Sequence, residues 1–223
     1  MDAAICGTPH RSRMMRTGAE RPSTSSEPDT GGTIGGGGGF ERSHAAASET
    51  HRQRLSTLRG MAVKDALLAE YDHEMGTTRR LLERLPDDKL AWKPHEKSMA
   101  LGELACHLGN IPNWAGTILN EASFDLETAP PNQTAKTSRA EILALFDQST
   151  KKTRGLMDKS DAEYMAPWSL KRGGQDMFSM PRIAAFRSFI LNHTIHHRGQ
   201  LSVYLRLNQI PVPPIYGPTA DEG

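Results

Sequence analysis

The sequence predicts an all-α protein whose helices pack as a four-helix bundle. Apolar residues recur at helical spacing in four segments, at residues 63–85, 99–120, 138–159 and 181–208. Loops rich in proline, glycine or asparagine separate these segments. No alternating strand pattern occurs outside one loop near residue 170. These three observations together favour a helical bundle over a sheet-containing fold.

The first 60 residues differ in composition from the remainder. Seven glycines fall between Gly31 and Gly39, with serine, threonine, proline and arginine around them. Such a segment cannot bury enough apolar surface to offset its ordering entropy. We therefore expect a disordered low-complexity extension at 1–60 and one folded domain at 61–223. One hypothesis places the native start at Met61, and the alternative is a genuine tail or linker.

Composition excludes several classes of protein. The net charge is +1, and neither part of the chain has the concentrated positive charge that nucleic-acid binding needs. No apolar run is long enough to span a membrane. The two cysteines, Cys6 and Cys106, are too few for a disulfide framework and favour a reducing, cytoplasmic compartment. For Cys106 we expect a small buried filler, with a metal ligand or reactive thiol as alternatives.

The first helix is expected over residues 63–85. Leu67 and Met75 recur two turns apart on its apolar face, and Pro86 ends it. Glu74 lies on the same face. Its carboxylate could serve a metal site or form an ion pair with an arginine at the edge of the bundle.

The second helix, at 99–120, carries a histidine on its apolar stripe. His107 lies between Leu104 and Ile111 at i+3 and i−4, so it faces the core. Pro112 should kink the helix about one turn past this histidine.

The third helix, at 138–159, has the capping-box signature of Ser138 followed by Glu141. Its inner face offers no histidine, cysteine or carboxylate. In the irregular stretch that follows, the segments around Trp168 and Phe178 could form a small hairpin or lid.

The fourth helix, at 181–208, carries three histidines within five positions. With about 100° per residue, His193 and His197 lie about 40° apart on its apolar face, and His196 lies on the flank. Arg198 could hold an anionic substrate. Its position about 140° from His193 instead favours a solvent-facing residue in a surface ion pair.

Two imidazoles buried one turn apart are costly unless something satisfies them. A divalent metal is one solution, because an i, i+4 pair aims two nitrogens at one point. Hydrogen bonds to core neighbours are the alternative. With His107 the interior holds three imidazoles, and three ligands plus an open position are typical of reactive metal sites.

Beyond the spacing argument, the chain from about residue 63 to 221 resembles the DinB family, named for damage-inducible proteins. The resembling residues are 71–74 (Tyr-Asp-His-Glu), 101–104 (Leu-Gly-Glu-Leu) leading to His107, 192–201 with its His-x-x-x-His-Arg-Gly-Gln run, Tyr204-Leu205, and the 213–218 tail.

The resemblance implies a DinB-like four-helix bundle that often dimerises. It also implies a divalent metal, nickel or zinc first and iron or manganese next, held by His107, His193 and His197. Relatives in the wider superfamily use the metal to bind a low-molecular-weight thiol that attacks an electrophilic small molecule.

Three classes of function follow from these features, and the last of them is a small-ligand binding module without a metal. The first is a metal-dependent thiol S-transferase or hydrolase, in which Gln200 or Glu74 orients a ligand. The second is a non-catalytic metal-binding stress-response protein, whose site mainly stabilises the bundle.

Overall fold

The structure is a computed structural model that describes residues 62–128 and 136–222. The extension expected at 1–60 lies outside the described residues. The helices are α2 (Val63–Leu82), α3 (Leu101–Asn110), α4 (Ala115–Asn120), α5 (Arg139–Leu156), α6 (Asp161–Met165), α7 (Arg182–Phe186) and α8 (His193–Leu207). The strands are β1 (Ser123–Asp125), β2 (Pro167–Arg172) and β3 (Gln175–Pro181).

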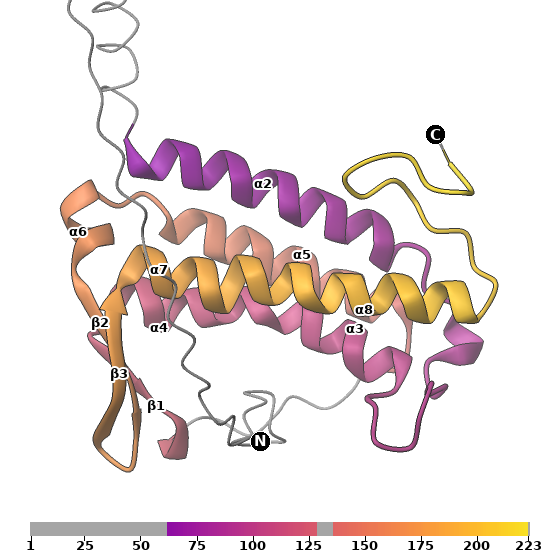
Figure 1. Ribbon diagram of the computed structural model, residues 1–223, viewed down its shortest axis with the longest axis horizontal. Coiled ribbons are helices and arrows are strands. Elements are labelled where there is room, and N and C mark those ends of the chain that lie inside the picture. The colour runs from indigo at the N-terminus through magenta and orange to yellow at the C-terminus, as the bar shows by residue number, and fades with distance from the viewer. Residues whose placement is uncertain (1–61, 129–135, 223) are drawn as a thin grey trace, which may run out of the picture. The chain divides into compact units, whose positions relative to one another are not determined.

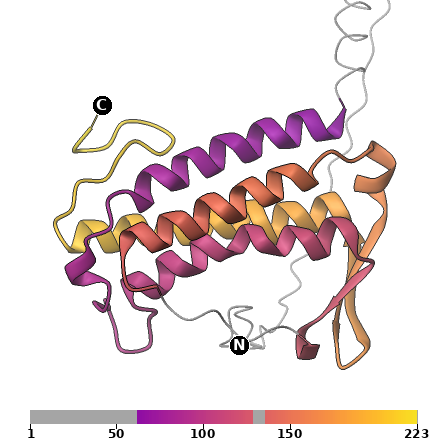
Figure 2. The same ribbon diagram turned by 180° about the vertical axis from the view of Figure 1, so that it is seen from behind.

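The long helical segments lie side by side around a common apolar core (Figures 1 and 2). α2 contacts α5 and α8, and α3 contacts the same two helices on the other side. Tyr71, Leu104, Phe146 and Phe186, one from each segment, are at most 1% exposed. The mainly helical class predicted from the sequence is therefore confirmed.

The second helical segment is interrupted at the proline that the sequence singles out. α3 ends at Asn110, a 3₁₀ turn occupies Ile111–Trp114, and α4 follows. Two buried hydroxyls of α5 satisfy carbonyl oxygens at this kink. Ser149 Oγ donates to the Gly109 carbonyl at 2.6 Å, and Thr153 Oγ1 donates to the Pro112 carbonyl at 2.5 Å.

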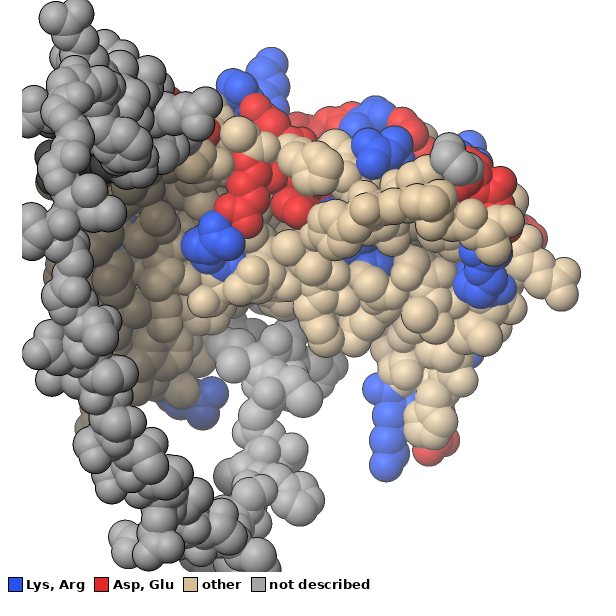
Figure 3. All heavy atoms as spheres, turned by 45° about the horizontal axis from the view of Figure 1, so that its top comes forward, with Lys and Arg blue, Asp and Glu red and all other residues tan. Residues whose placement is uncertain are grey.

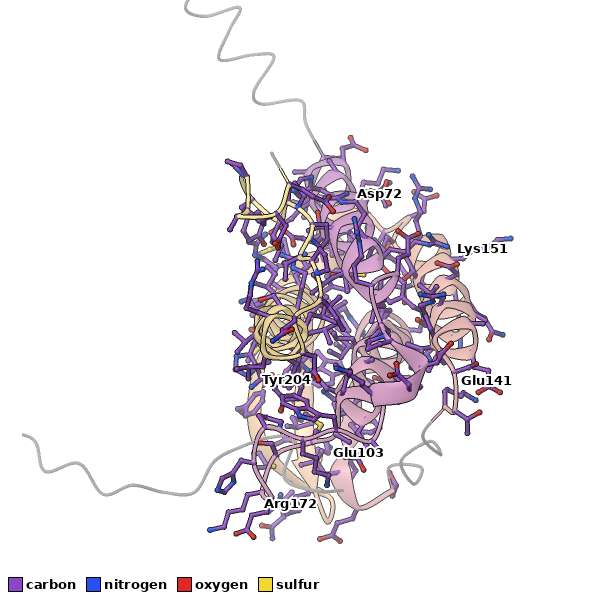
Figure 4. The ribbon with its side chains drawn as sticks, turned by 90° about the vertical axis from the view of Figure 1, so that its right-hand side faces the viewer. Asp72, Glu103, Glu141, Lys151, Arg172 and Tyr204 are labelled. Carbon is purple, nitrogen blue, oxygen red and sulfur yellow. The ribbon has the colours of Figure 1, made fainter. Side chains whose placement is uncertain are left out.

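The expected cap of the third helix is present in part. Ser138 Oγ accepts a hydrogen bond from the Glu141 N–H at 3.3 Å. The Glu141 carboxylate, however, accepts from the Thr137 N–H at 2.9 Å, one residue before the cap. Figure 4, which looks along the helices, shows Glu141 and Lys151 pointing outward from α5.

A three-stranded sheet is the main feature that the all-α prediction omits. β2 and β3 form the antiparallel hairpin expected around Trp168 and Phe178, and β1 adds to β2 in parallel. Gly173 and Gly174 have positive φ angles of 58° and 80° at the hairpin turn. Asp125 on β1 accepts hydrogen bonds from both glycine N–H groups, at 3.0 and 2.6 Å, and ties the third strand to this turn.

The fourth helical segment is not a uniform α-helix. Between α7 and α8, residues Arg187–Asn192 form a π-helical turn, which ends at the residue before His193. A π turn holds one residue more than an α turn, so the side chains after it point elsewhere than an ideal wheel predicts. Such turns often occur at functional sites.

Charged side chains on the outer surface form pairs of opposite sign. Arg79 of α2 binds Asp147 of α5 at 2.8 Å, and Arg154 of α5 binds Asp72 of α2 at 2.9 Å. Figure 3 shows acidic and basic side chains interspersed on the face that it presents. No helix within 62–128 or 136–222 is long and apolar enough to cross a bilayer.

Two helical glycines should respond in opposite directions to alanine. A Cβ at Gly102 would lie 3.1 Å from both the Cβ and the carbonyl oxygen of Leu90, whereas one at Gly76 would meet nothing within 4 Å. We expect Gly102→Ala to lower the free energy of unfolding by about 1–3 kcal/mol through overpacking. Gly76→Ala should raise it by about 0.5–1 kcal/mol, because glycine loses more entropy in a helix. Urea unfolding measures both, and equal effects would contradict the close approach at Leu90.

Candidate metal centre

Three histidine side chains from two neighbouring helices meet at one point inside the helical bundle. His107 lies in the last turns of α3, and His193 and His197 lie in the first turns of α8. His197 is 7% exposed, while His107 and His193 are half-buried. The inward orientation predicted for all three is therefore confirmed.

The ring nitrogens of these histidines are close enough to share a ligand. The Nε2 atoms of His107 and His193 are 3.2 Å apart. One nitrogen from each ring can be chosen so that all three lie within 4.8 Å of one another. The ring centroids of His107 and His197 are 4.5 Å apart and those of His193 and His197 are 4.6 Å apart.

Burial keeps these imidazoles neutral at physiological pH. It lowers the pKa of His107 to about 3, with further lowering from His197 and His193. Burial and the neighbouring His197 lower the pKa of His193 to about 4, against a hydrogen bond to the Phe189 backbone that acts to raise it. The pKa of His197 is also lowered, chiefly by burial. A neutral imidazole has the free lone pair that a metal ligand requires.

Gln200 holds the ring of His197 through its Nδ1 atom. His197 Nδ1 lies 2.8 Å from Gln200 Oε1, and this hydrogen bond acts to raise the pKa of His197, as a bond from a ring N–H does. With the proton on Nδ1, Nε2 carries the lone pair. Histidine metal ligands are typically held in this way through their other ring nitrogen. Of the two residues expected to orient a ligand, Gln200 is thus the one that contacts the site.

The donor set fits a divalent ion. Two nitrogens bound at about 2.1 Å to one ion at a tetrahedral angle lie about 3.4 Å apart. The spacing of 3.2 Å between His107 and His193 is close to this value. Neutral imidazoles suit zinc and nickel, among other ions. Within the described residues, no carboxylate or thiolate belongs to the cluster.

The structure contradicts the solvent-facing position expected for Arg198. Its side chain is 1% exposed and forms an ion pair of 2.6 Å with Glu74 of α2, which is 7% exposed. Glu74 therefore pairs with an arginine, as one of its two interpretations has it, but inside the bundle rather than at its edge. The offset of about 140° from His193 holds within α8, but that side of the helix packs against α2 instead of facing solvent.

The C-terminal tail, which the sequence predicts to pack across the bundle through Ile215 and Tyr216, completes the buried pair through Tyr216. Its hydroxyl donates to the Glu74 carboxylate at 2.9 Å and accepts from Arg198 Nη2 at 2.6 Å. Arg198 Nη1 also donates to the Glu74 carbonyl at 3.1 Å and to Thr78 Oγ1 at 3.3 Å. A buried ion pair contributes stability only when its remaining hydrogen bonds are satisfied in this way.

Cys106 stands apart from the cluster, although it precedes His107. It is half-buried against the core, and its Sγ accepts a hydrogen bond from the Lys136 N–H at 3.1 Å. Burial raises the pKa of its thiol. Both features fit the expected small filler rather than a reactive thiolate.

Comparison with known proteins assigns the chain to a family. The family model described as the DinB family matches residues 61–223. The chain belongs to the DinB family. Among curated proteins, the uncharacterized protein YrdA of Bacillus subtilis is 24% identical over 158 residues, which cover 71% of this chain and 90% of YrdA.

Two solved structures of DinB-like proteins share the fold. One, from Bacillus cereus, is 22% identical with a TM-score of 0.54, and covers 68% of this chain and 97% of its own. The other, YjoA of Bacillus subtilis, is 20% identical with the same TM-score and the same coverage. The DinB fold of this chain thus rests on both sequence and structure.

Loss of charge at Glu74 should cost far more stability than the same change on the surface of α2. Glu74→Gln leaves Arg198 as an uncompensated buried charge, and we expect the free energy of unfolding to fall by about 3–5 kcal/mol. Asp72→Asn breaks an exposed pair with Arg154 and should cost less than about 1 kcal/mol. Similar losses in urea unfolding would show that the buried pair does not stabilise the helix packing.

The metal-free protein should lose stability as the pH falls through the histidine range. The folded pKa values of about 3 for His107 and about 4 for His193 lie below the ordinary value. An unfolded histidine titrates near pH 6.5, so between about pH 6.5 and 4 the unfolded state binds protons that the folded state does not.

In this pH window, His107→Gln should reduce the slope of unfolding free energy against pH, because one such histidine is gone. His95→Gln, at an exposed position, should leave the slope unchanged. Chemical unfolding at a series of pH values measures the slope of unfolding free energy against pH for each variant. A wild-type curve that is flat from pH 6.5 to 4 would contradict the lowered pKa values.

Proposed function

We propose that this DinB-family protein binds one divalent metal ion through His107, His193 and His197 and exchanges a small-molecule ligand there. The observation that carries the proposal is the convergence of three neutral imidazoles, with ligand atoms within 4.8 Å of one another. Nickel and zinc are the ions proposed first, since imidazole nitrogen suits both. We also propose that the helices of this chain form the four-helix bundle of the DinB family.

The incomplete burial of the cluster supports ligand exchange. Closed structural sites normally have four protein ligands, whereas sites with three keep a position for water or substrate. The described residues supply three, and two of the three rings are half-buried rather than sealed in the core. A bound divalent ion would act as a Lewis acid that lowers the pKa of a thiol or water.

Thiol transfer to an electrophile is the reaction that the surroundings favour over hydrolysis. Within the described residues, no carboxylate joins the cluster, and Glu74 is committed to Arg198 and Tyr216. A thiol, with an ordinary pKa of about 8.5, loses its proton far more readily than water and needs no protein base. The chain would contribute orientation through Gln200 and shelter from solvent through the α3 and α8 walls.

A non-catalytic metal-binding role is the second candidate. The core of the described part is closed by buried apolar side chains and by the Arg198–Glu74 pair, neither of which requires a metal. Turnover with low-molecular-weight thiols and electrophiles would separate the two roles. The expected homodimer stays a prediction; the exposed Val203 and Leu207 on α8 offer an apolar surface for it.

The decisive test is the metal content of the full-length protein. We expect about one equivalent of divalent metal in the wild type and a large loss in His107→Ala, because one of three ligands is gone. His95→Ala is the matched control, since it removes an exposed histidine outside the cluster. Elemental analysis after purification measures the stoichiometry. Equal metal content in wild type and His107→Ala would refute the proposed site.

A further inference from the structure

A fourth histidine, which is exposed, is linked to the cluster through Gln200. The Gln200 side chain lies between His197 and His196, one turn away on α8. Its Oε1 is 2.8 Å from His197 Nδ1, and its Nε2 is 3.2 Å from His196 Nε2. His196 is exposed and does not belong to the group of three converging rings.

The amide of Gln200 can serve these neighbours in only two ways. With the oxygen toward His197, it accepts from Nδ1–H, and its NH₂ group donates to an unprotonated His196 Nε2. With the amide reversed, its NH₂ would face His197 Nδ1, which would have to accept. The proton of a neutral His197 would then move to Nε2, the atom that needs a lone pair to bind metal.

The tautomer of His196 is coupled to this choice, because a free lone pair on its Nε2 can accept only from the NH₂ group of Gln200. An acceptor at His196 Nε2 favours the NH₂ group of Gln200 on that side, and this leaves the oxygen for His197. Gln200 does not hold His193, whose Nε2 lies 3.2 Å from His107 Nε2. The two metal-ligand candidates of α8 thus differ in how their rings are held.

We propose that His196 is a positioning residue that acts through Gln200 to keep the proton of His197 on Nδ1 and its Nε2 free for the metal. This inference rests on the proposed metal site for its purpose. The hydrogen-bond chain itself belongs to the metal-free protein. It can therefore be tested whether or not a metal binds.

The test is the tautomer of His197 in the metal-free full-length protein. Nitrogen-15 NMR of the imidazole at about pH 8, above the ordinary histidine pKa of about 6.5, distinguishes Nδ1–H from Nε2–H. We expect Nδ1–H in the wild type. In His196→Phe, which keeps a ring but has no acceptor, a substantial fraction should shift to Nε2–H, and Gln200→Leu should show at least as large a shift.

Gln200→Glu supplies the internal rescue. A carboxylate has only acceptors, so it accepts a hydrogen bond from His197 Nδ1–H whichever residue stands at position 196. We expect Nδ1–H both in Gln200→Glu and in the double variant with His196→Phe. A general disturbance of the helix would not be reversed in this way. His95→Phe, at an exposed position elsewhere, should leave His197 unchanged.

Two outcomes would overturn the proposal: Nε2–H as the main tautomer in the wild type, or an unchanged tautomer in His196→Phe. Metal titration of the same proteins tests the metal site separately. Loss of an outer hydrogen bond typically lowers metal affinity 10–100-fold, about the loss expected for Gln200→Leu. A wild type that binds no metal would refute the proposed function and leave the tautomer result to decide the role of His196.

Discussion

The ion pair between Arg198 and Glu74 determines which side of α8 faces α2. Both side chains are almost fully enclosed, and neither charge can leave its partner without the cost of an isolated ion in the core. Arg198 follows His197 directly, so the rotation that buries the guanidinium also sets the direction of the imidazole before it. With α2 on that side, the flank that carries His193 and His197 turns toward α3 and His107. The charged pair and the histidine cluster are thus two results of one helix orientation.

The helices and the three histidines could be predicted from the sequence because each depends on local spacing. His107 lies between Leu104 and Ile111, and the i, i+4 separation of His193 and His197 holds within a regular helix. The kink at Pro112 could also be predicted locally, because proline cannot continue the hydrogen-bond pattern of a helix. These predictions needed no knowledge of what packs against each helix.

The features that escaped prediction depend on partners far along the chain. Burial of Arg198 depends on Tyr216 and Glu74, which lie 18 and 124 residues away. β1 is only three residues long, and its place beside β2 depends on Asp125 reaching the turn glycines. The hairpin of β2 and β3 is expected from the loop between them and not from alternation, because β3 has almost every side chain exposed. Neither strand produces a periodic pattern of its own.

The π turn at Arg187–Asn192 sets how far α8 is rotated about the helix axis relative to α7. Ahead of it, Phe186 is buried in the core; after it, His193 meets His107. Forcing all six residues into α-helical geometry would swing everything downstream by about 100° relative to what comes before, because the π turn fits one extra residue into the same rotation. Backbone hydrogen bonding would survive while the two halves lost their common alignment. The extra residue therefore allows one helical segment to bury Phe186 in the core and still direct His193 toward His107.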